Sequence, residues 1–228
     1  MNIELLFASA PETRRVSRKH ETAHGADLPY ARPGRAALLA NRVIDVAGAA
    51  CLLCLLAVPM LLIAALIKLT TRGPALYKQV RTGLGGRSFV MIKFRTMRVD
   101  AETQSGPVWS KLGDPRRTGI GIILRRYSLD ELPQLVNVLR GEMSLVGPRP
   151  ERPSFVQSFS QRIPTYNRRH QVVPGITGWA QINGWRGDTS IEKRLEFDLY
   201  YIRNWSVLFN IWILLLTPFA VLVEQNEC

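Results

Sequence analysis

Asp130 and Glu131 are the residues of this chain whose type and setting best suit catalysis. They stand side by side in the run Ser128-Leu129-Asp130-Glu131. An ionised carboxylate can attack phosphorus, and a carboxylate pair can hold a divalent cation together with phosphate oxygens. The run also has a structural interpretation as a helix capping box, in which Ser128 caps a helix and Glu131 reaches back to it. The two interpretations do not exclude one another.

Basic side chains are abundant in the chain. The formal net charge is +12, from 30 Lys and Arg against 18 Asp and Glu. This balance suits anionic partners such as phosphates, nucleic acid or an acidic lipid leaflet. Arg149 lies between two prolines, and a guanidinium on a rigid loop loses less entropy when it binds phosphate. The candidate phosphate-binding residues from the sequence are Lys93, Arg95, Arg125, Arg126 and Arg149.

Other kinds of site are poorly supported. The sequence contains no Walker-type loop ending in Lys-Ser/Thr and no GxGxxG after a strand. Its three histidines have no metal-ligand spacing, and its three cysteines form neither a disulfide framework nor a zinc site. Nucleic-acid binding would explain the charge but not the two long apolar segments, residues 46–67 and 205–223. The sequence therefore favours a phosphate-handling membrane protein over a nucleic-acid binder.

Residues 46–67 form an uncharged apolar stretch that is long enough to cross a bilayer. Pro59 lies inside it and removes one helical hydrogen bond, so the helix should kink or break there. Both flanks of the stretch are basic, and the positive-inside rule assigns both to the cytoplasm. Because a single span would place one basic flank outside, the pattern favours a re-entrant helix-break-helix over a kinked spanning helix.

The rest of the chain predicts an α+β fold that is mainly helical. Residues 75–81 and 88–93 read as strands of a small β-hairpin with glycines between them. Helical patterns cover 120–139, with an interruption near Ser128, and also 155–169 and 189–204, the last of them amphipathic. The expected division is a flexible basic leader (1–40), a re-entrant membrane helix (41–72), a cytoplasmic catalytic domain (73–204) and a C-terminal membrane-associated segment (205–228).

Three motifs strongly resemble the bacterial sugar transferases called monotopic phosphoglycosyl transferases. They are KFRTM at 93–97, DELPQLVNVLRGEMSLVGPRPERP at 130–153 and PGITGWAQINGWRGD at 174–188. The resemblance implies transfer of a hexose 1-phosphate from a UDP-sugar to undecaprenyl phosphate with release of UMP, the first membrane step of exopolysaccharide assembly. It also implies Mg²⁺, an aspartyl-phosphosugar intermediate, interfacial amphipathic helices and a catalytic domain on the cytoplasmic face of the bacterial inner membrane.

The resemblance also implies roles for individual residues. Asp130 is the nucleophile, and Glu131 is a metal ligand or a base, with Asp130 as a second candidate metal ligand. Arg125 and Arg149 hold phosphates, and Arg186 helps to place the nucleotide sugar. The remaining basic candidates are Lys93, Arg95 and Arg126.

The donor sugar and some local features stay open. The pattern at 193–206 most resembles the branch that transfers glucose 1-phosphate, with galactose 1-phosphate as the alternative. Asn210 and Trp212 stand where relatives usually carry an acidic residue and a lysine, so the C-terminal segment is more apolar than usual. A non-catalytic basic membrane scaffold is the rival function, and the sequence leaves a homo-oligomer open.

The re-entrant interpretation predicts the topology directly. Accessibility tags placed at Tyr30 and at Asp100 should both report the cytoplasm, because the chain would turn back within the bilayer. The measurement is labelling of each tag by a membrane-impermeant reagent in intact cells and in inverted vesicles. Labelling of one tag from outside the cell would contradict a re-entrant helix.

Overall fold

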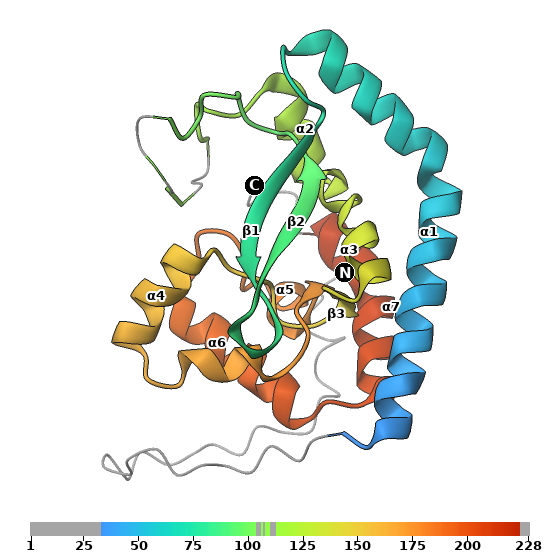
Figure 1. The fold of residues 1–228 in the computed structure, drawn as a ribbon, viewed down its shortest axis with the longest axis vertical. Helices are drawn as coiled ribbons and strands as arrows, with labels where there is room; N and C mark the ends of the chain where they lie inside the picture. Colours follow the sequence, from blue (N-terminus) through green and yellow to red (C-terminus); the bar gives the residue numbers. More distant parts are fainter. Residues whose placement is uncertain (1–32, 104–105, 107, 110–112, 224–228) are drawn as a thin grey trace.

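The computed structural model describes residues 33–103, 106, 108–109 and 113–223. Within these residues the protein is mainly helical and has two small two-stranded sheets. One long helix runs along an entire edge of the molecule, and the other elements gather on one side of it (Figure 1). The sequence prediction of a mainly helical α+β fold is therefore confirmed. Most of the predicted leader (1–40) lies outside the described residues.

Helix α1 (Arg35–Thr70) is the long helix at the edge, and it begins before the boundary expected at residue 41. It contains Pro59 yet is one continuous helix, so the predicted break takes the form of a bend, which Figure 1 shows as a change of direction. By length and composition it could cross a membrane, with a mean hydropathy of 2.9 over its most apolar 18 residues. Only Asp45, Ala49 and Ile67 of its side chains are buried.

The predicted β-hairpin is present. Strands β1 (Leu76–Thr82) and β2 (Ser88–Phe94) pair antiparallel, with Leu76 opposite Phe94 and Thr82 opposite Ser88. The turn contains a short 3₁₀ segment, η2 (Leu84–Gly86), in which Gly85 and Gly86 have positive φ angles of 62° and 77°. Glycine adopts this conformation without a steric penalty. The hairpin carries the end of β2 into the interior, where Lys93 is buried.

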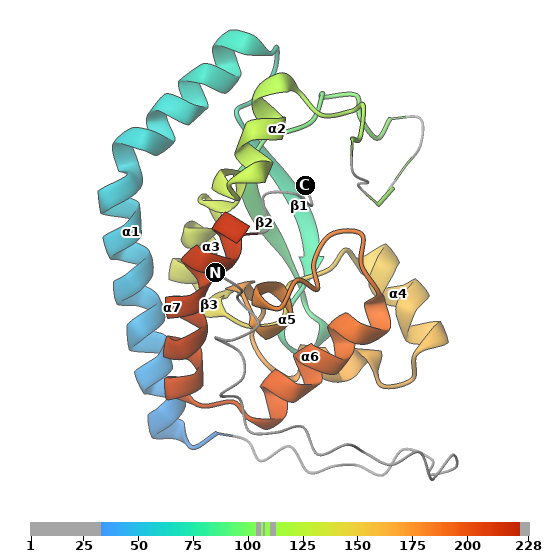
Figure 2. The ribbon, with the colours of Figure 1, turned by 180° about the vertical axis from the view of Figure 1, so that it is seen from behind.

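The second half of the chain supplies the remaining helices and the second sheet. Strands β3 (Ser144–Val146) and β4 (Gly175–Thr177) pair in parallel. Helix α7 (Val207–Val223) lies alongside α1 in both ribbon views (Figures 1 and 2). The other elements are α2 (Gly119–Arg126), η3 (Leu129–Glu131), α3 (Gln134–Arg140), α4 (Pro153–Arg162), η4 (Tyr166–Gln171), α5 (Trp179–Ile182) and α6 (Ile191–Arg203).

A buried polar network joins α1 to the parallel strands. Asp45 of α1 accepts hydrogen bonds from the Ser144 hydroxyl at 3.0 Å and from the Leu145 backbone N–H at 2.8 Å. Asn210 of α7 donates to the side-chain oxygen of Asn41 at 2.6 Å and accepts from the Tyr201 hydroxyl at 2.8 Å. Buried polar groups that lack partners are costly, so this network favours one packing position of α1 and α7 against the strands.

Asn137 fastens the hairpin to α3. Its side chain is fully buried, accepts a hydrogen bond from the Ile92 backbone N–H at 3.0 Å and donates to the Val90 carbonyl at 2.7 Å. The amide therefore pairs backbone groups of β2 that no third strand reaches. This contact holds Lys93, the neighbour of Ile92, in a fixed place.

Replacing Asn137 with alanine should destabilise the fold. The buried Ile92 N–H and the partly buried Val90 carbonyl would lose their partners, and a buried polar group left without one costs about 1–3 kcal/mol. Thermal unfolding of the detergent-purified protein should show a clearly lower Tm for Asn137→Ala. The matched control is Asn204→Ala, which removes an exposed amide that bonds only the Tyr200 carbonyl. Equal Tm values for the two variants would contradict this role for Asn137.

Candidate active site

The carboxylate pair lies in a strained turn between α2 and α3. Ser128 precedes it with a positive φ of 55°, the only such non-glycine residue in the described part of the chain. This left-handed conformation costs roughly 1–2 kcal/mol for an L-residue, and strain of this kind clusters at functional sites. The predicted interruption near Ser128 is confirmed, and the turn presents Asp130 and Glu131 on a single 3₁₀ segment, η3.

The capping-box interpretation is wrong. The Ser128 side chain makes no capping hydrogen bond, and its hydroxyl instead receives one from Arg186 at 3.3 Å. The Glu131 carboxylate turns away from Ser128 and binds Arg149. The left-handed backbone at Ser128 explains this result, because an N-cap residue normally has an extended backbone that aims its side chain at the following N–H groups. The negative charge of Glu131 is therefore balanced by cationic side chains such as Arg149.

Asp130 is buried, with 4% of its surface exposed. Burial and the negative charge of Glu131 raise its pKa to about 6, while Lys93, Arg125 and Arg149 oppose this rise. Burial also lowers the pKa of Lys93 to about 8. Asp130 is therefore mostly ionised at neutral pH but is poorly solvated, which favours a nucleophile.

Glu131 and Arg149 form a two-pronged ion pair. One guanidinium nitrogen lies 2.9 Å from one carboxylate oxygen, and the second nitrogen contacts the other oxygen. Burial alone would raise the pKa of Glu131, but the charge and hydrogen bonds of Arg149 lower it to about 2. Both side chains keep some exposure, 27% for Arg149 and 15% for Glu131. This pair lies at the surface of the site, within reach of a ligand.

The loop that carries Arg149 is held at its backbone. Gly147 donates its N–H to the Thr177 carbonyl at 2.9 Å, and Gly175 donates to the Pro148 carbonyl at 3.0 Å. A side chain at Gly147 would have its Cβ 2.4 Å from the Val173 carbonyl oxygen, so only glycine fits there. The sheet of β3 and β4 and the flanking prolines thus fix the position from which Arg149 projects.

Two buried ion pairs from α6 support the same loop. Arg169 donates to the Arg149 carbonyl at 2.8 Å and pairs with Asp198 of α6 at 2.7 Å. Glu151 accepts from Arg194 of α6 at 2.9 Å and from Arg81 of β1 at 3.3 Å. Breaking one partner of a buried pair is strongly destabilising, so these contacts tie the loop to α6 and to the hairpin.

The structure brings together most of the predicted site residues, but not all of them. The charges of Lys93, Arg125 and Arg149 lower the pKa of Asp130, and the charge of Arg186 lowers that of Glu131. Arg95 instead donates to Thr71 and Arg72 at the end of α1. Arg126 is exposed and stacks on the Tyr127 ring at 5.9 Å. The phosphate-binding assignment of these last two arginines gains no geometric support.

Sequence reasoning missed several residues around the site. Arg81 belongs to the basic flank that follows residues 46–67, and the sequence alone does not indicate that its charge acts on Lys93. The sequence also does not indicate a place at the site for Glu151, Arg169 and Asp198, or for Gln181 within its motif. The only signal in the sequence was the position of Glu151 directly after the Pro-Arg-Pro run, because the other contacts join distant segments.

The carboxylate pair is a reasonable partial ligand set for Mg²⁺. Among the described residues there is no group of three or more His, Cys, Asp or Glu side chains that could hold a metal ion. Mg²⁺ in phosphate-handling enzymes is often held by one or two carboxylates, with substrate phosphates and waters completing the shell. Asp130 and Glu131 thus fit a Mg²⁺ ion bound together with a diphosphate.

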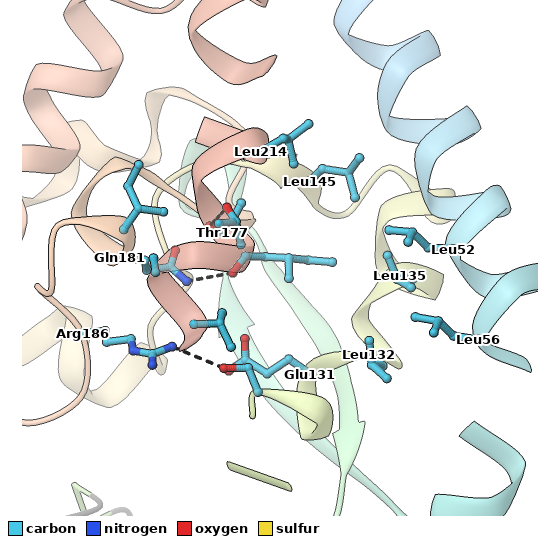
Figure 3. A pocket seen from close by; sticks show the side chains of 16 residues that line it. Leu52, Leu56, Glu131, Leu132, Leu135, Leu145, Thr177, Gln181, Arg186 and Leu214 are labelled. Carbon is cyan, nitrogen blue, oxygen red and sulfur yellow. Dashed lines mark hydrogen bonds between the residues drawn. The ribbon is translucent and has the colours of Figure 1, made fainter. Parts of the chain in front are cut away.

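A cavity of about 230 Å³ adjoins the pair on its other side. Figure 3 shows Arg186 and Gln181 on one side of it and Leu52, Leu56 and Leu135 on the opposite side, with Glu131 near the polar end. The Oε1 atom of Gln181 is buried and has no hydrogen-bond partner within the described part of the chain. Asp130 does not line this cavity. Glu131 therefore lies both in the cavity lining and beside Asp130 with its surrounding cations, and Arg186, which also lines the cavity, acts on the Glu131 carboxylate.

The raised pKa of Asp130 predicts that its charge destabilises the fold. An acid with a raised folded-state pKa costs stability at high pH, and the cost disappears as the pH falls through the folded pKa toward the unfolded value. Asp130→Asn should therefore stabilise the metal-free protein by roughly 2 kcal/mol above about pH 6 and by little below about pH 4.

Thermal unfolding with a chelator present, over a series of pH values, measures this effect. Glu196→Gln is the matched control, because its carboxylate is 64% exposed and should show no comparable gain. If Asp130→Asn were no more stable than the parent above pH 6, the surrounding cations would outweigh burial and the inferred pKa direction would be wrong.

Comparisons with known proteins agree with the arrangement of these motifs. A family model described as bacterial sugar transferase matches residues 36–224. The UDP-glucose:undecaprenyl-phosphate glucose-1-phosphate transferase of Escherichia coli K12 is 47% identical over 82% of this chain and 41% of its own length. The protein of the same name from Caulobacter vibrioides is 47% identical over 82% of this chain and 72% of its own.

A third relative carries a different donor name. The UDP-N-acetylgalactosamine-undecaprenyl-phosphate N-acetylgalactosaminephosphotransferase of Aeromonas hydrophila is 40% identical over 91% of this chain and 48% of its own length. The chain thus spans about two fifths of the Escherichia coli relative and about half of the Aeromonas one. On the match across residues 36–224, the chain belongs to the bacterial sugar transferase family.

Proposed function

We propose that this protein transfers a hexose 1-phosphate, most simply glucose 1-phosphate, from a UDP-sugar to undecaprenyl phosphate. The observation that carries the proposal is the setting of Asp130. A buried carboxylate with a raised pKa stands among Lys93, Arg125 and Arg149, beside a second carboxylate. Phosphoryl transfer depends mostly on positioning and on charge neutralisation, and this cluster can provide both.

The proposed reaction has two steps through Asp130. In the first, a carboxylate oxygen attacks the sugar-bearing phosphorus of the donor. The bond from that phosphorus to the bridging oxygen breaks, and UMP leaves with the electron pair. In the second, an oxygen of undecaprenyl phosphate attacks the same phosphorus, and Asp130 leaves as a free carboxylate. No oxidant, reductant or water is consumed.

The chain's own residues have distinct tasks in this scheme. Lys93 and Arg125 face Asp130 and stabilise negative charge that develops on the transferred phosphate. Arg149 exchanges its bond with Glu131 for a bond with a phosphate oxygen, which its partial exposure allows. Glu131 and Asp130 would hold a Mg²⁺ ion. The bound ion would neutralise the diphosphate and polarise the bond to the leaving UMP.

The choice of glucose rests on the relatives. The Escherichia coli and Caulobacter vibrioides proteins carry UDP-glucose in their names, and the more distant Aeromonas hydrophila protein carries UDP-N-acetylgalactosamine. The higher identity to the first two supports glucose 1-phosphate. A galactose-type donor is the alternative, and a comparison of several UDP-sugars distinguishes them.

We further propose that α1 is re-entrant in the cytoplasmic membrane. Near its start, Arg42 donates to the Val138 and Leu139 carbonyls at 2.6 and 2.9 Å. Near its end, Ile67 packs with Phe94 and Leu124. Both ends of α1 thus contact the same body, whereas a straight span would place its two ends on opposite sides of the hydrocarbon core. This arrangement supports a catalytic domain that lies on the cytoplasmic face.

Trapping the covalent intermediate tests the enzymatic proposal. The purified protein is incubated with Mg²⁺ and UDP-glucose labelled in the sugar-attached phosphate, and the lipid is omitted. Label should remain on the parent chain, and Asp130→Asn should lose label and turnover by at least about a thousandfold. Glu196→Gln, an exposed carboxylate-to-amide change, should retain both.

The outcome also separates the enzyme from a basic membrane scaffold. A scaffold would bind anionic vesicles but would turn over no UDP-sugar, and Asp130→Asn would leave its vesicle binding unchanged. Rapid lipid-dependent turnover without any trapped label would instead indicate direct transfer, and the two-step scheme would be wrong.

A further inference from the structure

The cavity beside Glu131 has the character of a binding site for an amphiphile. Its apolar wall comes from α1, α3 and α7, and includes Leu52, Leu56, Leu135 and Leu214. Its polar end carries Glu131 and Arg186 (Figure 3). Ser128 also belongs to the lining. A nucleotide would be a poor match for the aliphatic wall, and a free phosphate would leave that wall without a partner. A phosphate joined to a hydrocarbon chain suits both ends.

The cavity also reaches the outer surface between the two apolar helices. Leu52 lines it and yet remains 38% exposed. Next to the cavity residues, α1 and α7 present exposed apolar side chains, such as Leu55 at 72% and Leu215 at 61%. Exposed apolar surface of this extent is typical of contact with a membrane. A chain lying in the bilayer could therefore enter the cavity without crossing water.

We propose that this cavity holds the first isoprene units of the undecaprenyl phosphate acceptor, with its phosphate directed at Arg186 and Glu131. The inference rests on the proposed function and goes beyond it by assigning the lipid path. Asp130 lies outside the cavity among the cations, so the donor side and the acceptor side meet at Glu131. The lipid phosphate would then approach the loaded phosphosugar from the α1–α7 side.

Filling the cavity tests this assignment. Leu56→Trp adds bulk inside it, and Leu55→Trp makes the same change on the neighbouring exposed position. Leu56→Trp should still trap the labelled phosphosugar on Asp130 without lipid. Its efficiency of transfer to undecaprenyl phosphate should fall about tenfold or more, mainly through a higher acceptor KM, because the indole ring takes up space that the lipid would occupy. Leu55→Trp should behave like the parent.

Photolabelling of the unaltered full chain gives a second measurement that does not depend on variant folding. Undecaprenyl phosphate with a diazirine on its first isoprene unit should label residues 52–56 and 214–221. Excess unlabelled undecaprenyl phosphate should compete, and excess phosphatidylglycerol vesicles should not. Labelling that is confined to other segments would overturn the assignment. Labelling that phosphatidylglycerol vesicles abolish by competition would also overturn it.

The two proposals fail in different ways. If the parent chain traps no phosphosugar, the proposed function itself is at fault. If the parent is active but Leu56→Trp transfers to lipid as fast as Leu55→Trp, only the acceptor path is wrong. Loss of trapping in Leu56→Trp indicates a misfolded variant, and the labelling experiment then decides.

Discussion

The site depends on one electrostatic constraint: a buried carboxylate stands beside a half-buried one, and the two must not both be protonated. The surroundings of the two carboxylates meet this constraint in different ways. Arg149 binds Glu131 in a two-pronged pair and lowers its pKa to about 2. Within the described part of the chain Asp130 makes no such pair, and burial beside Glu131 raises its pKa to about 6. Environments that push two pKa values apart commonly separate the roles of two acids. In the proposed mechanism Glu131 is the fixed anion and Asp130 the reactive one.

This division of roles requires rigid surroundings. The Arg149 loop is bonded to β4 by its backbone and to α6 through Arg169, Asp198 and Glu151. The other side of the site is held by Asn137, which seats β2 and therefore Lys93. A displacement of a charged group by about 1 Å can cost two orders of magnitude in rate, so such supports are as important as the groups that they hold.

The membrane elements are joined to the same rigid body. The Asp45 carboxylate of α1 bonds to the strand that leads into the Arg149 loop, and Asn210 of α7 bonds to Asn41 of α1. Asn210 places a neutral amide at this buried junction, where it both donates and accepts a hydrogen bond. Membrane seating and the geometry of the catalytic loop are therefore physically linked through β3.

Local patterns in the sequence determined the carboxylate pair, the hairpin, the interruption near Ser128 and the apolar helix, because each depends on residues close together in the chain. Tertiary structure alone decided which cation met which partner. Arg95 went to the end of α1, Arg186 came to Ser128 from 58 residues away, and Glu131 paired with Arg149 instead of capping its own helix. A guanidinium can donate to a carbonyl, a carboxylate or a phosphate, so long-range packing decides which of them it meets. The cavity between α1 and α7 has the same origin, because it exists only where distant helices meet.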